Sequence, residues 1–149
     1  MKVKIKLLTE TAKIPTKGSV NAAGYDLYAD FNPPNGAFLS IGPHETVKIP
    51  TGIAIEIPYG FFGGIFPRSG ISTKRGLRPA NCVGVIDADY RGEIFVAIHN
   101  DSDKIQYIEP DERVAQLIVI PCADISWDIS EELKSTARGN GGFGSTGTN

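Results

Sequence analysis

The chain has 149 residues, and its 17 Gly and 10 Pro make up 27 of them, about 18% against a usual share of roughly 12%. Both residues interrupt helices, which argues against a helical bundle or a coiled coil. The formal charge of −2 lacks the basic excess of a protein that binds a nucleic-acid backbone, and no apolar stretch approaches the ~18 residues that span a bilayer.

Lysines alternate with apolar residues at the start of the chain, which is not the pattern of a signal peptide. We therefore expect one domain in the cytoplasm, or in the interior of a host cell if the chain is viral. We expect neither a membrane nor a nucleic-acid polymer as a partner.

Short apolar or alternating runs follow one another along the chain, with turn residues between them. Gly, Pro, Asn and Asp punctuate the runs, for example at Asn32–Gly36 and Glu109–Glu112. Short strands at roughly 8–12-residue spacing predict an all-β fold, either a barrel or a jelly-roll sandwich. The predicted strands are 2–7, 25–29, 46–49, 53–57, 61–66, 83–86, 93–99, 104–108 and 114–120.

One short helix is expected after the strand at 61–66. Ser69 is suited to cap it, residues 71–75 can form a turn or two, and Gly76 is a natural stop. A second, weaker helix is expected at 130–134.

The last residues, 138–149, are rich in glycine, so we expect an arm that follows a β domain at 1–137. Composition alone is typical of a disordered tail. Consecutive glycines, however, let several backbone N–H groups turn toward one anion, and an isolated aromatic can stack on a planar ring. The pattern predicts a lid that closes over a nucleoside polyphosphate. Its side chains are Arg138, Phe143, Ser145 and Thr146.

A second candidate phosphate site is Pro67-Arg68-Ser69-Gly70, where a strand passes into the expected helix. Backbone amides at a helix start, a hydroxyl and a guanidinium all favour a phosphate there. The alternative is that Ser69 only caps the helix and Arg68 is a surface charge.

Two aspartates are candidates for chemistry. Asp87 follows an apolar run and is expected to point inward, where an unpaired carboxylate is costly. Beside a triphosphate it can orient an attacking water. Asp26 stands in the middle of a strand, where Asp is disfavoured, and is a candidate for contacting metal-bound water. The alternatives are a turn-stabilising role for Asp87 and a structural ion pair for Asp26.

Five segments in chain order now match one pattern: Ala23–Leu27, Pro67–Gly70, Gly84–Gly92, Arg113–Gln116 and Arg138–Gly147. From about residue 2 to residue 147 the chain resembles the homotrimeric deoxyuridine triphosphatase (dUTPase) family. The resemblance implies a distorted jelly-roll-like β-barrel with one short helix and a flexible glycine-rich arm, and a homotrimer whose subunits share their active sites. It also implies Mg²⁺-dependent hydrolysis of dUTP to dUMP and pyrophosphate, which removes dUTP from the nucleotide pool and supplies dUMP for thymidylate synthesis.

The resemblance further implies a role for each matching position. In the base and sugar pocket, Tyr90 would exclude a ribose and Asp87 would hold the attacking water. The other residues of that pocket would be Asn81, Gly84, Val85, Ile86 and Phe95. The phosphate contacts would be Arg68, Ser69, Gly70 and Gln116.

The metal and the arm complete the implied site. Asp26 would bind Mg²⁺ through water, while the ion is held mainly by the phosphates, and Arg113 would be a structural ion-pair member. Phe143 would stack on the uracil. Arg138, Gly144, Ser145 and Thr146 would close on the γ-phosphate.

Three other interpretations compete with this one. A dCTP deaminase has a similar architecture but uses a Glu beside its base pocket, and the segment 81–87 contains none. A nucleotide-binding regulatory module without turnover would not need Asp87 and a complete arm. A capsid-like structural jelly roll leaves the five ordered motifs unexplained.

Overall fold

The computed structural model describes residues 1–33 and 37–142, and the strands of this part are short. No helix in these two stretches is long and apolar enough to cross a membrane. The elements are β1 (Lys4–Leu7), β2 (Thr16–Lys17), β3 (Tyr25–Tyr28), β4 (Leu39–Ile41), β5 (Thr46–Pro50), β6 (Ile53–Glu56), β7 (Phe61–Phe66), α1 (Ser69–Arg75), β8 (Leu77–Pro79), β9 (Gly84–Ile86), β10 (Phe95–Asn100), β11 (Gln106–Ile108) and β12 (Arg113–Pro121).

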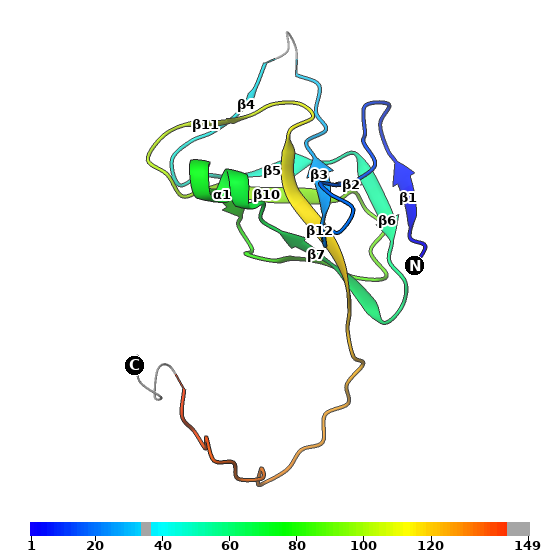
Figure 1. The fold of residues 1–149 in the computed structure, drawn as a ribbon, viewed down its shortest axis with the longest axis vertical. Helices are drawn as coiled ribbons and strands as arrows, with labels where there is room; N and C mark the ends of the chain where they lie inside the picture. Colours follow the sequence, from blue (N-terminus) through cyan, green and yellow to red (C-terminus); the bar gives the residue numbers. More distant parts are fainter. Residues whose placement is uncertain (34–36, 143–149) are drawn as a thin grey trace.

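Antiparallel pairing groups these strands into four sheets, with orders β2-β3-β12-β7-β9, β5-β10-β8, β1-β6 and β11-β4. Figure 1 shows them wrapped around one another, with α1 on the outside. The interior between the sheets is aliphatic, and Leu27, Ile49, Ile98, Ile108 and Val114 are fully buried in it. The predicted all-β class with one short helix is confirmed. Within the described residues the pairings form four sheets, not one closed ring of strands.

Three strands were not predicted: β2, β4 and β8. Each has only two or three residues, which is too short to display an alternating pattern. The predicted helix at 130–134 is wrong, because this segment is irregular and exposed. Its one large apolar side chain, Leu133, is 90% exposed, so no packing stabilises a helix there.

The helix α1 begins one residue earlier than a Ser69 cap requires. Arg68 occupies the N-cap position in extended conformation and makes no capping hydrogen bond with its side chain. Gly76 ends the helix as predicted, in the left-handed conformation with φ of 67°, and its N–H bonds to the Ser72 carbonyl at 3.1 Å. Ser69 is exposed at the first helical position, so it does not serve as the cap.

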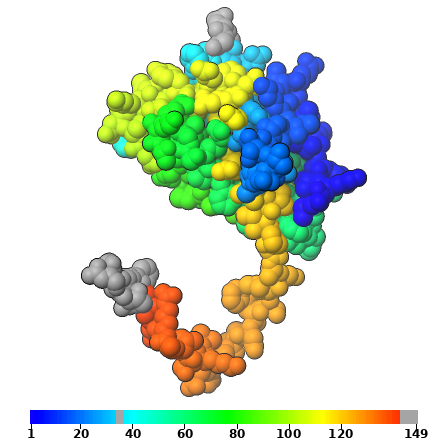
Figure 2. All heavy atoms as spheres, viewed as in Figure 1, coloured from blue at the N-terminus to red at the C-terminus, as the bar shows by residue number. Residues whose placement is uncertain are grey.

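Beyond β12 the chain leaves the packed body. All residues from 121 to 140 are exposed, and Figures 1 and 2 show this segment extending away from the sheets. It carries Ile125, Trp127, Ile129 and Leu133, which are 62–99% exposed. Large apolar side chains that are this exposed on one segment are typical of a surface that contacts another chain.

Candidate active site

The loop after β9 places Asp87 at the edge of a cavity of about 290 Å³. The strands β9 and β10 contribute half of its lining residues, because Val85 and Ile86 lie on β9 and Phe95 and Ala97 lie on β10. Five of the predicted site residues meet here: Val85, Ile86, Asp87, Tyr90 and Phe95.

The expectation that Asp87 points inward is wrong, since Asp87 is exposed. The turn that carries it closes through the Tyr90 N–H, which donates to the Asp87 carbonyl at 3.1 Å, and so leaves the carboxylate outside the core.

Three further residues of this cavity were missed: Lys48, Glu93 and Ala97. Lys48 reaches the cavity only because β5 pairs with β10 in a register that sets it opposite Ala97. That register is a tertiary property, and no local pattern signals it.

The outer edge of β9 is available to a ligand. In the described residues β9 is the last strand of its sheet and pairs only with β7, with Val85 opposite Gly64. Its other backbone groups can therefore bind a planar hydrogen-bonding partner. Asn81 lies beside this strand, because a Cβ built on the buried Gly84 would stand 3.2 Å from the Asn81 amide nitrogen.

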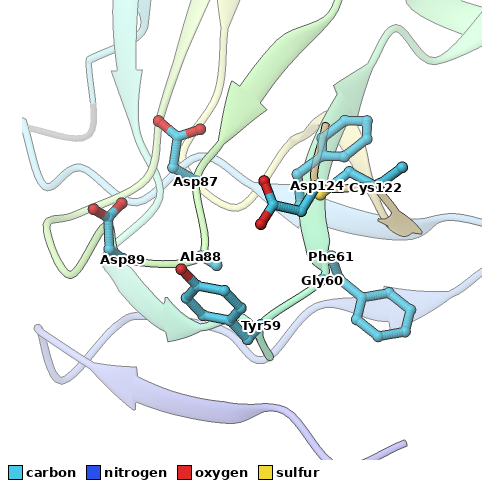
Figure 3. Close-up of a pocket in the computed structure, with 10 residues that line it drawn as sticks. Tyr59, Gly60, Phe61, Asp87, Ala88, Asp89, Cys122 and Asp124 are labelled. Atoms are coloured by element: carbon cyan, nitrogen blue, oxygen red, sulfur yellow. The ribbon is translucent and has the colours of Figure 1, made fainter. Parts of the chain in front are cut away.

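Asp87 also borders a second cavity of about 320 Å³, shown in Figure 3. The carboxylates of Asp87, Asp89 and Asp124 line it together with Tyr59, and no basic side chain of the described residues does. A cavity lined by three carboxylates repels a triphosphate. The cavity beside β10 is therefore the better candidate for a nucleotide.

The predicted phosphate-binding residues lie together at the other end of β7. Asp26, Arg68, Ser69, Gly70 and Gln116 line one cavity of about 200 Å³. Its arginines and exposed hydroxyl give it the chemistry of an anion site.

Asp26 is nearly buried in this cavity and is held by two arginines. Its Oδ1 accepts from Arg68 Nε at 2.7 Å and its Oδ2 accepts from Arg113 at 3.2 Å. Arg68 also donates to the Arg113 carbonyl at 3.1 Å. The structural ion pair is therefore present. A carboxylate has about four lone-pair positions, so the ion pair leaves room for a water-mediated metal contact.

A glycine makes room for the Gln116 side chain. The Gln116 amide donates to the Pro67 carbonyl at 2.9 Å. A Cβ on the buried Gly24 would stand 2.2 Å from Gln116 Oε1 and 3.0 Å from Gln116 Cβ. The glycine of the Ala23–Leu27 segment was not given a role from sequence, because its neighbour lies on another strand.

The two cavities lie at opposite ends of β7. Ile86 pairs with Gly63, whereas Gln116 pairs with Phe66, three residues further along, or roughly 10 Å of strand. Asp87 lies beyond the first pair and Arg68 lies beyond the second, in the opposite direction.

The arm is described only in part. Arg138 is exposed, and it closes a local turn by donating to the Gly141 carbonyl at 2.8 Å. Four predicted contacts, Phe143, Gly144, Ser145 and Thr146, lie outside the described residues.

Comparison with known proteins decides the family. The dUTPase family model matches residues 10–147. The chain is 41% identical to the deoxyuridine 5'-triphosphate nucleotidohydrolase of Orientia tsutsugamushi strain Ikeda, with 99% of each chain covered. It is 44% identical to that of Candida albicans, with 99% of this chain and 89% of the relative covered. The chain belongs to the dUTPase family.

The fold of this dUTPase matches solved relatives over nearly its whole length. A Staphylococcus bacteriophage 80alpha dUTPase solved with dUPNHPP is 30% identical, with a TM-score of 0.86 and 98% of each chain covered. A point mutant of the dUTPase from phage phi11 of S. aureus, studied for its structural Mg(II) ion, is 25% identical with a TM-score of 0.79, over 91% of this chain and 100% of that one. The predicted family and the predicted enzyme class, a dUTP nucleotidohydrolase, are confirmed.

Proposed function

We propose that this chain hydrolyses dUTP to dUMP and pyrophosphate by attack of water on the α-phosphate, and so removes dUTP from the nucleotide pool and supplies dUMP for thymidylate synthesis. The observation that carries the proposal is the cavity that gathers Val85, Ile86, Asp87, Tyr90 and Phe95. It combines a carboxylate with aromatic walls and the open edge of a strand. The cytoplasmic location stays a prediction.

Base selectivity is assigned to the outer edge of β9. The Asn81 amide and the free backbone groups near Val85 and Ile86 offer both donors and acceptors, as the edge of uracil requires. A site that pairs a base edge leaves buried groups unsatisfied with the wrong base, which gives discrimination of up to about 10⁴–10⁵. The Tyr90 ring packs against the sugar and excludes a 2′-hydroxyl.

The phosphates are assigned to Arg68, Ser69, Gly70 and Gln116, and the arm closes over them with Arg138. Asp87 holds the attacking water and takes part of its proton as the P–O bond forms, while pyrophosphate leaves. The arm contacts of Phe143 through Thr146 remain part of the proposal.

Mg²⁺ fits the donor groups that the chain offers. No three metal-ligating side chains within 1–33 and 37–142 converge to hold an ion, and Asp26 is the one carboxylate of the phosphate cavity. Mg²⁺ is usually bound by one or two carboxylates together with substrate phosphates and water. Asp26 would hold it through water, and the bound ion would offset phosphate charge and polarise the phosphoryl oxygens.

We further propose a homotrimer whose subunits share each active site. Asp87 and Arg68 lie at opposite ends of β7. Within one chain, the cavity beside Asp87 and the phosphate cavity are therefore separated along this strand. A site that needs both is completed when a second copy brings its own phosphate cavity to the Asp87 loop. The exposed apolar residues between Pro121 and Arg138 support the same assembly.

Substituting Gly24 by Ala is expected to weaken phosphate binding. The added methyl overlaps Gln116 and displaces its amide from the Pro67 carbonyl. We expect KM for dUTP to rise by roughly tenfold, in line with the loss of the proposed hydrogen bond from the Gln116 amide to a charged phosphate oxygen. Steady-state kinetics check this. Gly42→Ala is the control, since Gly42 lies outside this cavity and its added Cβ meets only the Glu45 side chain within 4 Å. Equal KM values for both variants would contradict the role given to Gln116.

Pyrophosphate release tests the function itself. The assay compares dUTP, dCTP, dTTP and UTP, each with Mg²⁺ and with a chelator. We expect rapid release from dUTP alone, and loss of that release with the chelator. Ammonia released from dCTP would instead favour the deaminase alternative.

A further inference from the structure

The Tyr90 ring is held in one place by its neighbours along the chain. Its hydroxyl donates to the Glu93 carbonyl at 2.9 Å. A Cβ on Gly92 would stand 2.5 Å from the Tyr90 hydroxyl oxygen and 2.7 Å from Cζ. The outer end of the ring therefore lies directly against Gly92, where an added Cβ would push the ring aside.

Glu93 is in turn anchored to the turn between β5 and β6. Its Oε1 accepts from the Gly52 N–H at 2.9 Å. The buried Thr51 hydroxyl donates to the Ile94 carbonyl at 2.6 Å, so two hydrogen bonds join 93–94 to 51–52. Gly52 has φ of 65°, and a Cβ there would overlap the Asp30 carboxylate at 1.9 Å.

Asp30 also holds the turn between β5 and β6 in place. Asp30 is nearly buried, accepts from the Thr11 hydroxyl at 2.6 Å and from the Thr9 hydroxyl, and donates its N–H to the Pro50 carbonyl at 2.8 Å. The support of Tyr90 thus extends from the surface loop to a buried, hydrogen-bonded carboxylate. Glu93 and Tyr90 line the same cavity as Asp87.

We propose that Gly92 and Glu93 determine the discrimination between deoxyribose and ribose by fixing the position of the Tyr90 ring. The proposal rests on the proposed function, in which this ring packs against the sugar. Steric exclusion of one hydroxyl works only if the excluding group cannot swing aside. A Tyr side chain has two rotatable bonds, and the Gly92 surface and the Glu93 carbonyl remove that freedom. Both residues act through Tyr90 and are positioning residues.

The test is the ratio of kcat/KM for dUTP to kcat/KM for UTP. The methyl group added in Gly92→Ala pushes only the far end of the Tyr90 side chain, so the ring moves while the fold is kept. We expect the ratio to fall by about tenfold or more, within the range that one methyl-sized change in a pocket produces. Glu93→Ala removes the anchor to Gly52 and should lower the ratio in the same direction. Glu93→Gln keeps an oxygen acceptor for the Gly52 N–H and should restore it.

Glu45→Ala is the matched control. The Glu45 carboxylate also accepts from a glycine N–H, that of Gly42 at 2.7 Å, in the turn between β4 and β5. Its loss should leave the ratio unchanged. Calorimetric titration with dUMP and UMP measures the preference for deoxyribose as a ratio of affinities without turnover, and this ratio should also fall in Gly92→Ala and Glu93→Ala.

The outcomes separate the two proposals. A wild type that prefers dUTP to UTP, together with Gly92→Ala and Glu93→Ala variants of unchanged ratio, overturns the positioning role alone. If Gly92→Ala does not fold, the comparison of Glu93→Ala with Glu93→Gln decides the question. A wild type that does not hydrolyse dUTP overturns the proposed function, and this inference with it.

Discussion

Replacing Asp87 by Asn is expected to leave dUTP binding intact while kcat falls by about 10²–10⁴, the usual contribution of a positioned acid or base. Asn has nearly the same shape, so the walls formed by Val85, Ile86 and Tyr90 should remain in place. The turn itself closes through backbone atoms of Asp87 and Tyr90 and does not depend on the carboxylate. An amide, however, cannot accept a proton from the attacking water. Calorimetric titration with a non-hydrolysable analogue and pyrophosphate release measure the two quantities.

Asp89→Asn is the matched control for this variant. Asp89 is exposed two residues away in the same loop, and it borders the acidic cavity of Figure 3 but not the cavity beside β10. We expect it to keep most of the turnover. Equal losses of turnover in both variants would show that turnover depends on the charge of the loop rather than on a carboxylate that positions water. Undiminished turnover in Asp87→Asn would falsify the mechanism.

Truncation of the chain after Ala137 is expected to cause the second large loss of activity. We expect the fold and the oligomer to persist, because the body ends at Pro121 and the apolar residues Ile125, Trp127, Ile129 and Leu133 are retained. The variant loses Arg138 and the glycine-rich donors that would close on the phosphates. The value of kcat/KM for dUTP should drop by roughly 10²–10³, as when donors to a developing charge are removed.

The control for the truncation removes only residues 148–149, which follow the matching segment and should be dispensable. Circular dichroism and gel filtration establish that the longer truncation is folded and of unchanged size. Intact kinetics after removal of 138–149 would contradict the lid.

Much of the fold follows from local pattern, and its exceptions have simple causes. The strand at Phe61–Phe66 and the helix stop at Gly76 were predictable because periodicity and glycine act over a few residues. The two-residue strand at Thr16–Lys17 was not, since its conformation depends on pairing with β3. The helix prediction at 130–134 failed because Leu133 is exposed and packs on no surface of the described residues.

The candidate site likewise contains some features that local sequence predicts and others that depend on contacts between distant strands. Asp87 and Gln116 were identified from ordered motifs, yet the exposure of Asp87 was not, because burial depends on how the turn leaves the sheet. Lys48 enters the cavity through the register of β5 on β10. The constraint that Gly24 places on Gln116 needs two strands to be side by side. Contacts between strands distant in sequence are the part that pattern alone could not supply.

Subunit complementation tests the shared active site most directly. Asp87→Asn chains and Arg68→Ala/Gln116→Ala chains, each inactive alone, are co-expressed with different tags, and mixed oligomers are isolated. If Asp87 and the phosphate cavity of one site come from different copies, each isolated mixed trimer should regain about a third of the wild-type pyrophosphate release, since one of its three sites then combines two intact halves. Mixed oligomers that remain as inactive as their parents would contradict the account, because a site contained in one chain always carries one of the two defects.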